Sequence, residues 1–268
     1  MKTQFRMLAC AAATALALTL TPALAQDKEF QPSVGQMGKD VIWVPTAQGL
    51  VDRMLEMAKV TPNDFLIDLG SGDGRTVITA AKRGVKAIGV EYNPDMVALS
   101  RKNAEKEGAK LAEFVQGDIF EYDFSKATVL TLFLLPQINL RLRPTILNMK
   151  PGTRVVSNSF DMGDWPADEV QEAKTECQTY CRAMLWVVPA KVQGDWTVNG
   201  GRISLNQAYQ NVSGSMNVNG TQTPISNGKL NGDNFTFEVG GKQFKGKVTD
   251  SAIEGTLGSD AFSAKRAN

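Results

Sequence analysis

The most constraining feature of the sequence is a glycine-rich segment between an expected strand and an expected helix. Residues 65–67 are Phe-Leu-Ile, and residues 68–74 read Asp-Leu-Gly-Ser-Gly-Asp-Gly before a helical apolar pattern begins. Glycines allow the backbone to turn tightly and to approach a ligand closely. Glu91 ends the next expected strand, about twenty residues further on, where a carboxylate can take both hydroxyls of a ribose. The pattern predicts a nucleoside-containing ligand at the end of a parallel sheet.

The spacing of the glycines separates classes of nucleotide ligand. A dinucleotide fingerprint, G-x-G-x-x-G, that started at Gly70 would need glycine where the chain has Arg75. Asp68, just before the glycines, would repel a pyrophosphate but can meet the positively charged amino-acid end of S-adenosylmethionine. The sequence therefore disfavours an NAD-dependent oxidoreductase.

Composition narrows the chemistry further. The 268-residue chain contains no histidine, which excludes Ser-His-Asp triads and histidine-ligated metals, and its three cysteines make a zinc site improbable. We expect no metal. Methyl transfer remains, because the sulfonium is already activated and the protein mainly positions two reactants. We assign no catalytic residue and no general base.

The first 25 residues predict export. Lys2 and Arg6 precede an uncharged run over residues 7–24, which ends in Ala-Leu-Ala before Gln26. We expect a signal peptide cleaved after Ala25, a periplasmic product and no stable membrane anchor. The alternative is a retained anchor, because the run is nearly long enough to span a bilayer.

Cleavage would leave Cys177 and Cys181 as the remaining cysteines. In an oxidising compartment a pair this close in sequence can staple a tight turn, if the two Cβ atoms face each other. Two unlinked thiols are the alternative.

Apolar periodicity predicts an α/β domain over residues 41–190. A flexible leader at residues 26–40 precedes a helix at 46–59. Short apolar runs then alternate with amphipathic ones, as in a parallel sheet covered by helices. The expected strands are 65–68, 87–90, 112–115, 128–134, 154–157 and 183–188, and the other expected helices are 76–83 and 94–107.

Residues 192–268 have a different texture. They are rich in Gly, Asn, Ser and Thr, with short alternating apolar segments and no helical period. We expect a small all-β domain, an antiparallel meander or partial barrel, with hairpin turns at Asn219-Gly220 and Asn227-Gly228. Its role does not follow from the sequence.

Three motifs together resemble those of the class I S-adenosylmethionine-dependent methyltransferases. They lie at residues 67–75, at Gly-Val-Glu-Tyr-Asn-Pro over 89–94, and at Gly117-Asp118. Residues 44–46, 68–75 and 91–94 more narrowly resemble the mitochondrial lysine methyltransferases of the ATP synthase c-subunit and the adenine nucleotide translocase, with their bacterial relatives. This implies a Rossmann-like seven-stranded sheet and S-adenosyl-L-methionine as cofactor, with a protein lysine as the possible methyl acceptor.

The residues and the resemblance together give a candidate cofactor site. Asp118 follows the third strand, where it can accept from the adenine amino group beside Ile119, although an ordinary surface aspartate is the alternative. Thr46 would reach the cofactor carboxylate from the preceding loop. The predicted set is Thr46, Asp68, Gly70, Ser71, Gly72, Glu91, Asp118 and Ile119.

The acceptor is less defined than the cofactor. Residues 133–139, Phe-Leu-Leu-Pro-Gln-Ile-Asn, lack the Asn-Pro-Pro-Tyr of many methyltransferases that act on nucleic acid bases, so we expect no nucleic acid partner. Pro136 and Gln137 are expected to border the transfer site, and Trp43 to wall the acceptor channel. The equal alternative is that these side chains only pack in the fold. A small-molecule methyltransferase and a non-catalytic exported binding protein on the same fold remain alternatives.

Overall fold

The computed structural model describes residues 30–267. The expected signal peptide, Cys10 and the first residues of the leader lie outside this described range. Within it, no helix is both long and apolar enough to cross a membrane.

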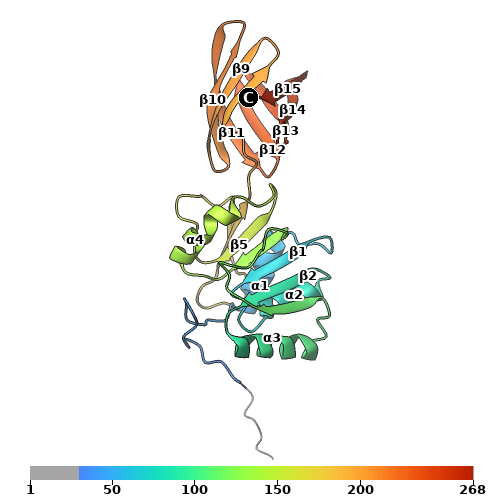
Figure 1. Ribbon diagram of the computed structural model, residues 1–268, viewed down its shortest axis with the longest axis vertical. Coiled ribbons are helices and arrows are strands. Elements are labelled where there is room, and N and C mark those ends of the chain that lie inside the picture. Colours follow the sequence, from blue (N-terminus) through green and yellow to red (C-terminus); the bar gives the residue numbers. More distant parts are fainter. Residues whose placement is uncertain (1–29, 268) are drawn as a thin grey trace, which may run out of the picture. The chain divides into compact units, whose positions relative to one another are not determined.

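The first part of the chain forms an open seven-stranded sheet in the order β3-β2-β1-β4-β5-β7-β6 (Figure 1). Its first five strands pair in parallel, and β7 pairs antiparallel with both β5 and β6. The strands are β1 Phe65–Leu69, β2 Lys86–Glu91, β3 Ala112–Gln116, β4 Val129–Leu132, β5 Arg154–Asn158, β6 Glu169–Glu172 and β7 Arg182–Val187. The strands expected from the sequence are confirmed, and β6 is an additional one.

Helices cover both faces of this sheet. The helices α1 Gln48–Met57, α2 Arg75–Lys82 and α3 Pro94–Lys106 confirm the three expected ones, and their apolar stripes form one buried cluster with side chains such as Leu66 and Val129. A fourth helix, α4 Pro136–Ile146, packs in a second cluster with Ile67 and Leu130. Because β1 contributes Leu66 to one cluster and Ile67 to the other, the alternation of its side chains places the sheet between the two layers.

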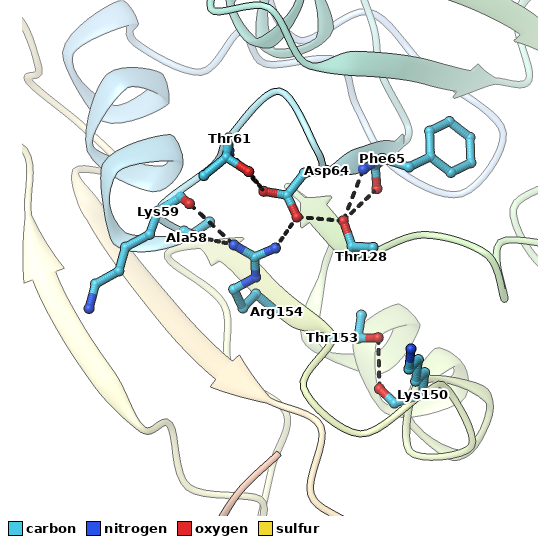
Figure 2. Close-up of polar contacts among 9 residues, drawn as sticks. All are labelled: Ala58, Lys59, Thr61, Asp64, Phe65, Thr128, Lys150, Thr153 and Arg154. Carbon is cyan, nitrogen blue, oxygen red and sulfur yellow. Dashed lines mark hydrogen bonds and ion pairs between the residues drawn. The ribbon is translucent and has the colours of Figure 1, made fainter. Parts of the chain in front are cut away.

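A polar network ties the starts of three parallel strands together (Figure 2). The Arg154 guanidinium pairs with Asp64 and donates to the carbonyl of Ala58 at 2.6 Å. Asp64 also accepts from Thr128 Oγ1 at 2.7 Å and from the Thr61 amide at 2.8 Å. Burial raises the pKa of Asp64, but the hydrogen bonds from Thr128 and its other partners outweigh it and hold the pKa below the ordinary value. These contacts fix the sheet at the edge where β1, β4 and β5 begin.

The C-terminal part is a closed antiparallel barrel rather than a partial one (Figure 1). Its strands are β8 Gly194–Val198, β9 Gly201–Ala208, β10 Asn211–Val218, β11 Thr221–Asn231, β12 Asn234–Val239, β13 Lys242–Val248, β14 Ala252–Leu257 and β15 Asp260–Arg266. Pairing of β15 with β8 closes it. Alternate side chains fill the interior, and the rings of Phe237 and Phe244 stack with centroids 4.6 Å apart.

One of the two expected hairpin turns is wrong. Asn219 and Gly220 do form the turn between β10 and β11, each with a positive φ. Asn227 and Gly228 instead lie inside β11, where the pairing with β12 shifts register. Asn227 has a φ of 52°, so the Asn-Gly pair produces a bulge in one continuous strand. A bulge needs the same left-handed conformation as a turn, which is why local sequence does not separate them.

Candidate functional site

A pocket lies where the parallel strands end. Its walls come from the segment 36–46, the glycine loop after β1, the end of β2, the loop after β3, the residues after β4 and β5, and the loop before β7. The carboxyl ends of the strands in an open α/β sheet are the usual place for a ligand. All eight residues predicted for the cofactor site line this pocket.

The glycine loop needs its glycines for two different reasons. Gly70 and Gly72 have φ angles of 80° and 54°, which side chains rarely tolerate. A Cβ atom on Gly72 would in addition lie 2.7 Å from Nε1 of Trp43. Trp43 therefore packs directly on the loop, and it also lines the pocket.

Asp68 lies one residue before the end of β1 and carries a buried carboxyl group. It accepts a hydrogen bond of 2.7 Å from Thr131 Oγ1 on β4. Burial raises the pKa of Asp68 to about 7, the hydrogen bond from Thr131 opposes the shift, and the negative charge of Glu91 adds to it. A cationic group placed against Asp68 would relieve this cost, so the carboxyl group is suited to bind an ammonium.

Glu91 organises the loop around the pocket. One of its carboxylate oxygens accepts from the Gly72 amide and the other from the Asn93 amide, both at 3.0 Å. Each oxygen has a second lone pair for a further donor. Glu91 can therefore hold the loop and still accept from the hydroxyls of a ribose.

Asp118 is held by a residue that the sequence did not point to. One oxygen accepts from the Phe120 amide at 2.9 Å, and the other pairs with Lys39. The hydrogen bond from Lys39 is the main reason why the pKa of Asp118 lies below its ordinary value. Lys39 also lies 4.9 Å from the ring centroid of Tyr92. An adenine amino group would share Asp118 with this lysine.

The segment expected as a leader contributes to the pocket from Gln36 onward. The amide of Trp43 donates to the carbonyl of Gln36 at 2.9 Å, and that of Gly35 to the carbonyl of Trp43 at 2.8 Å. These bonds form a short hairpin that brings Lys39 to Asp118. Polar composition alone did not reveal this role, because the pairing of Lys39 with Asp118 joins residues 79 positions apart.

Thr46 and Ser71 are both buried in the pocket wall. The Thr46 carbonyl accepts from Arg75 at 2.8 Å, and its hydroxyl accepts from Asn158 at 3.3 Å. The Ser71 hydroxyl is buried without a hydrogen-bond partner in this structure. This hydroxyl packs against β2, where a Cβ atom on Gly89 would lie 2.5 Å from it, so Ser71 faces the pocket with its backbone rather than with its hydroxyl. Ile119 lines the same pocket.

Three aromatic residues on the pocket wall were not predicted. Phe133 follows β4, Phe160 follows β5, and Tyr180 precedes β7. The centroid of the Tyr180 ring lies 5.3 Å from that of Phe133 and 5.9 Å from that of Phe160. We call these three residues the aromatic rim. Only the fold brings them together, because up to 47 positions separate them in the sequence.

Two expected neighbours of the transfer site are misplaced. Pro136 and Gln137 are exposed in the first turn of α4 and are not part of the pocket wall. Leu134, Leu135 and Ile138 occupy that wall instead. The sequence was interpreted at this point as a target-binding loop. The structure instead has helix α4, whose first turn directs Pro136 and Gln137 away from the pocket.

Cys177 and Cys181 form a disulfide with their Cα atoms 5.7 Å apart. Of the two alternatives left open by the sequence, the structure has the bonded one. Tyr180 lies inside the loop that this disulfide closes, with a φ of 56°.

The residues present fit S-adenosylmethionine. Asp68 offers a buried acceptor for the ammonium, and Glu91 has free lone pairs for a ribose. With the open sheet, whose seventh strand runs antiparallel, this site defines a class I S-adenosylmethionine-dependent methyltransferase.

Comparison with known proteins gives the family. The family model of the ANTKMT methyltransferase domain matches residues 68–169. A protein-lysine N-methyltransferase of Saccharolobus islandicus is 48% identical over 134 residues, which are 48% of this chain and 83% of that relative. The chain belongs to this family of methyltransferases.

Two further relatives bear on the site. The human lysine N-methyltransferase of the ATP synthase c-subunit is 34% identical over 130 residues, which are 48% of this chain and 55% of that protein. A crystal structure described as an RNA methyltransferase from Salinibacter ruber, in complex with S-adenosyl-L-homocysteine, is 47% identical with a TM-score of 0.52. It is similar over 56% of this chain and 96% of that one.

Proposed function

We propose that this protein transfers a methyl group from S-adenosylmethionine to the side-chain amine of lysine in a protein. The observation that carries the proposal is the 48% identity to a protein-lysine N-methyltransferase, across 83% of that relative. The net charge of +1 supports it, because a nucleic acid enzyme usually carries a basic surface.

The cofactor would be held by the residues predicted from the sequence. Asp68 would accept from its ammonium group, Glu91 from the ribose and Asp118 from the adenine. The backbone at Gly70, Ser71 and Gly72 would pack against it, and Thr46 and Ile119 would line the same pocket. When bound, S-adenosylmethionine supplies a methyl group on a sulfonium, and transfer replaces its carbon–sulfur bond by a carbon–nitrogen bond while the electron pair stays on sulfur.

The chain's own residues position the acceptor. An amine must arrive without its extra proton, because only the neutral nitrogen has a lone pair, and that proton passes to water. The half-buried rings of Phe133 and Phe160 offer apolar contact to the carbon stem that carries the amine. Positioning supplies the rest of the rate enhancement.

A transfer assay tests the proposed acceptor. The purified chain is incubated with methyl-labelled cofactor and with protein and RNA extracted from cells in which the gene is deleted. We expect the label in methyl-lysine after acid hydrolysis, and none from the Asp68→Ala variant. Label found only in methylated nucleosides, or in neither fraction, would contradict the proposal.

We further propose that the enzyme works in the periplasm, on the strength of the signal pattern over residues 1–25. The disulfide between Cys177 and Cys181 agrees with an oxidising compartment. Cell fractionation followed by intact-mass measurement, with and without reductant, tests both points. A cytoplasmic product that retains residues 1–25 would overturn the assignment.

A further inference from the structure

The aromatic rim lies in the same pocket as the cofactor residues but serves none of them. Phe133 directly follows Leu132, and Leu132 pairs with Leu69 beside the glycine loop. The rim therefore stands close to where the methyl group must be presented. Phe133 and Phe160 are half-buried, and Tyr180 is 46% exposed. Rings in this state leave part of their surface open to a second ligand.

The chemistry of the rim suits one kind of acceptor. The rings of Phe133 and Phe160 stack at 6.1 Å with 20° between their planes, and the Tyr180 ring stands at 62° to that of Phe133. Such a surface takes an aliphatic stem by apolar contact. Its ring faces also attract the positive charge that a nitrogen gains as it receives a methyl group. A lysine side chain combines a four-carbon stem with such a nitrogen.

Tyr180 is held in this position by its own loop. A tyrosine with a φ of 56° is uncommon, because its Cβ crowds the backbone in the left-handed region. The disulfide between Cys177 and Cys181 encloses Tyr180 and joins the chain on either side of it. Strained residues persist where the surrounding structure fixes them, and they cluster at ligand sites.

We propose that the aromatic rim is the acceptor subsite for a lysine side chain, and that the disulfide positions Tyr180 within it. The identity of the acceptor rests on the proposed function. The rim determines which side chain enters, and the disulfide acts through Tyr180 without touching the substrate. Reduction would therefore weaken acceptor binding while it leaves the cofactor half of the pocket intact.

Binding without turnover tests the subsite. The full mature chain, saturated with S-adenosylhomocysteine, is titrated with acetyl-Gly-Lys-Gly-amide peptides whose lysine carries a free, a trimethylated or an acetylated ε-nitrogen. We expect both cationic peptides to bind more tightly than the acetylated one. Phe160→Leu and Tyr180→Leu keep apolar volume but remove a ring face, and each should weaken the cationic peptides about tenfold.

Matched controls separate the rim from general damage. Phe262→Leu removes a half-buried ring from the aromatic cluster of the barrel and should bind all peptides as the wild type does. Tyr180→Phe should also behave as the wild type, because the ring face remains. Unchanged cationic binding in both rim variants, equal weakening by Phe262→Leu, or loss of S-adenosylhomocysteine binding in the rim variants would each overturn the proposal.

Reductant tests the positioning role. With a protein acceptor identified in the transfer assay, reduction of the wild type should raise KM for the acceptor several-fold and change kcat and cofactor affinity less than twofold. A Cys177→Ala, Cys181→Ala double variant should show the raised KM and no response to reductant. An unchanged KM after reduction would overturn the role. Lysine methylation can fail while the rim still binds cationic peptides, so the two proposals fail separately.

Discussion

The α/β domain and the barrel differ in what they bury. Among residues 30–267, the buried side-chain polar atoms without a partner belong to Arg53, Ser71, Asn139, Ser157 and Asn158, all in the α/β domain. The barrel strands bury aliphatic and aromatic side chains, and its one buried polar residue, Gln210, lies between β9 and β10. An apolar interior requires only filled volume, whereas each buried polar atom without a partner is costly, so the α/β domain carries a cost that the barrel does not.

The largest predicted change in stability is in the barrel. Phe237→Ala removes a ring that is 1% exposed and stacks on Phe244. We expect a loss of about 3–5 kcal/mol in the barrel's free energy of unfolding, because a cavity remains. Denaturant titration followed by tryptophan fluorescence, to which Trp196 contributes from the barrel, measures it. Calorimetry should show unchanged affinity for S-adenosylmethionine, and a parallel loss of that affinity would refute the separation of the two domains.

Asp68→Asn should produce the opposite response in the α/β domain without cofactor. The pKa of Asp68 is about 7 in the folded protein against a reference of 3.8. The folded state therefore keeps a proton that the unfolded chain has released, and wild-type stability falls as pH rises from about 4 to 7.

The Asp68→Asn variant should not lose stability over this pH range. Its advantage in free energy of unfolding should grow from near zero at about pH 4 to about 4 kcal/mol at pH 7, and stay constant above. Denaturation of the cofactor-free proteins across this range measures it. Asp260→Asn on the barrel surface should show no growing gain, since the pKa of Asp260 is lowered by Lys242. A constant difference for Asp68→Asn would show that the carboxyl group is not desolvated.

Glu91→Ala should weaken the cofactor without unfolding the sheet. The substitution removes the acceptor for the Gly72 amide and for the expected ribose hydroxyls. Charge-assisted hydrogen bonds of about 1.5–3 kcal/mol correspond to about 10- to 150-fold in affinity. Calorimetry with S-adenosylmethionine measures it, and Glu238→Ala in the barrel is the control. If Glu91→Ala bound S-adenosylmethionine with wild-type affinity, Glu91 would not be part of the cofactor site.

The smallest effect is expected from deleting the barrel. A chain that ends at Val188 keeps every residue predicted to bind the cofactor. Its affinity for S-adenosylmethionine should stay within about twofold of the full chain, as for distant independent sites. Calorimetry and far-ultraviolet circular dichroism check this. A truncated chain with native helix content and no binding would show that the barrel completes the site.

The sequence predicted the elements whose periodicity is strong and whose ends carry glycine, proline or asparagine. Asn93 begins α3 by accepting from the Asp95 amide at 2.8 Å, a cap that the sequence makes visible. Helix α4 was missed because Pro144 lies inside it and its polar start resembles a loop. The closing pair of β15 and β8 joins residues about seventy positions apart, a distance at which local patterns carry no information.

The cofactor half of the site followed from the sequence better than the acceptor half. Asp68, Gly70 and Glu91 belong to strand ends with a fixed spacing, so the motif itself places them on one pocket. Phe160 and Tyr180 have no such spacing, and aromatic residues are far more often core packing than ligand contacts. Lys39 was assigned to a leader, since nothing in its neighbours signals a partner at Asp118.

The antiparallel direction of β7 affects where a further domain can follow the methyltransferase domain in the chain. Val187 pairs with Arg154, the first residue of β5, so β7 ends at the edge where the parallel strands begin. The pocket lies at the other edge, and a chain that continues past β7 departs without passing its mouth. A folded module can thus be grafted there by gene fusion with no loop of the entrance rebuilt. The Salinibacter ruber chain, matched over 96% of its length by 56% of this one, has the size of the ungrafted core.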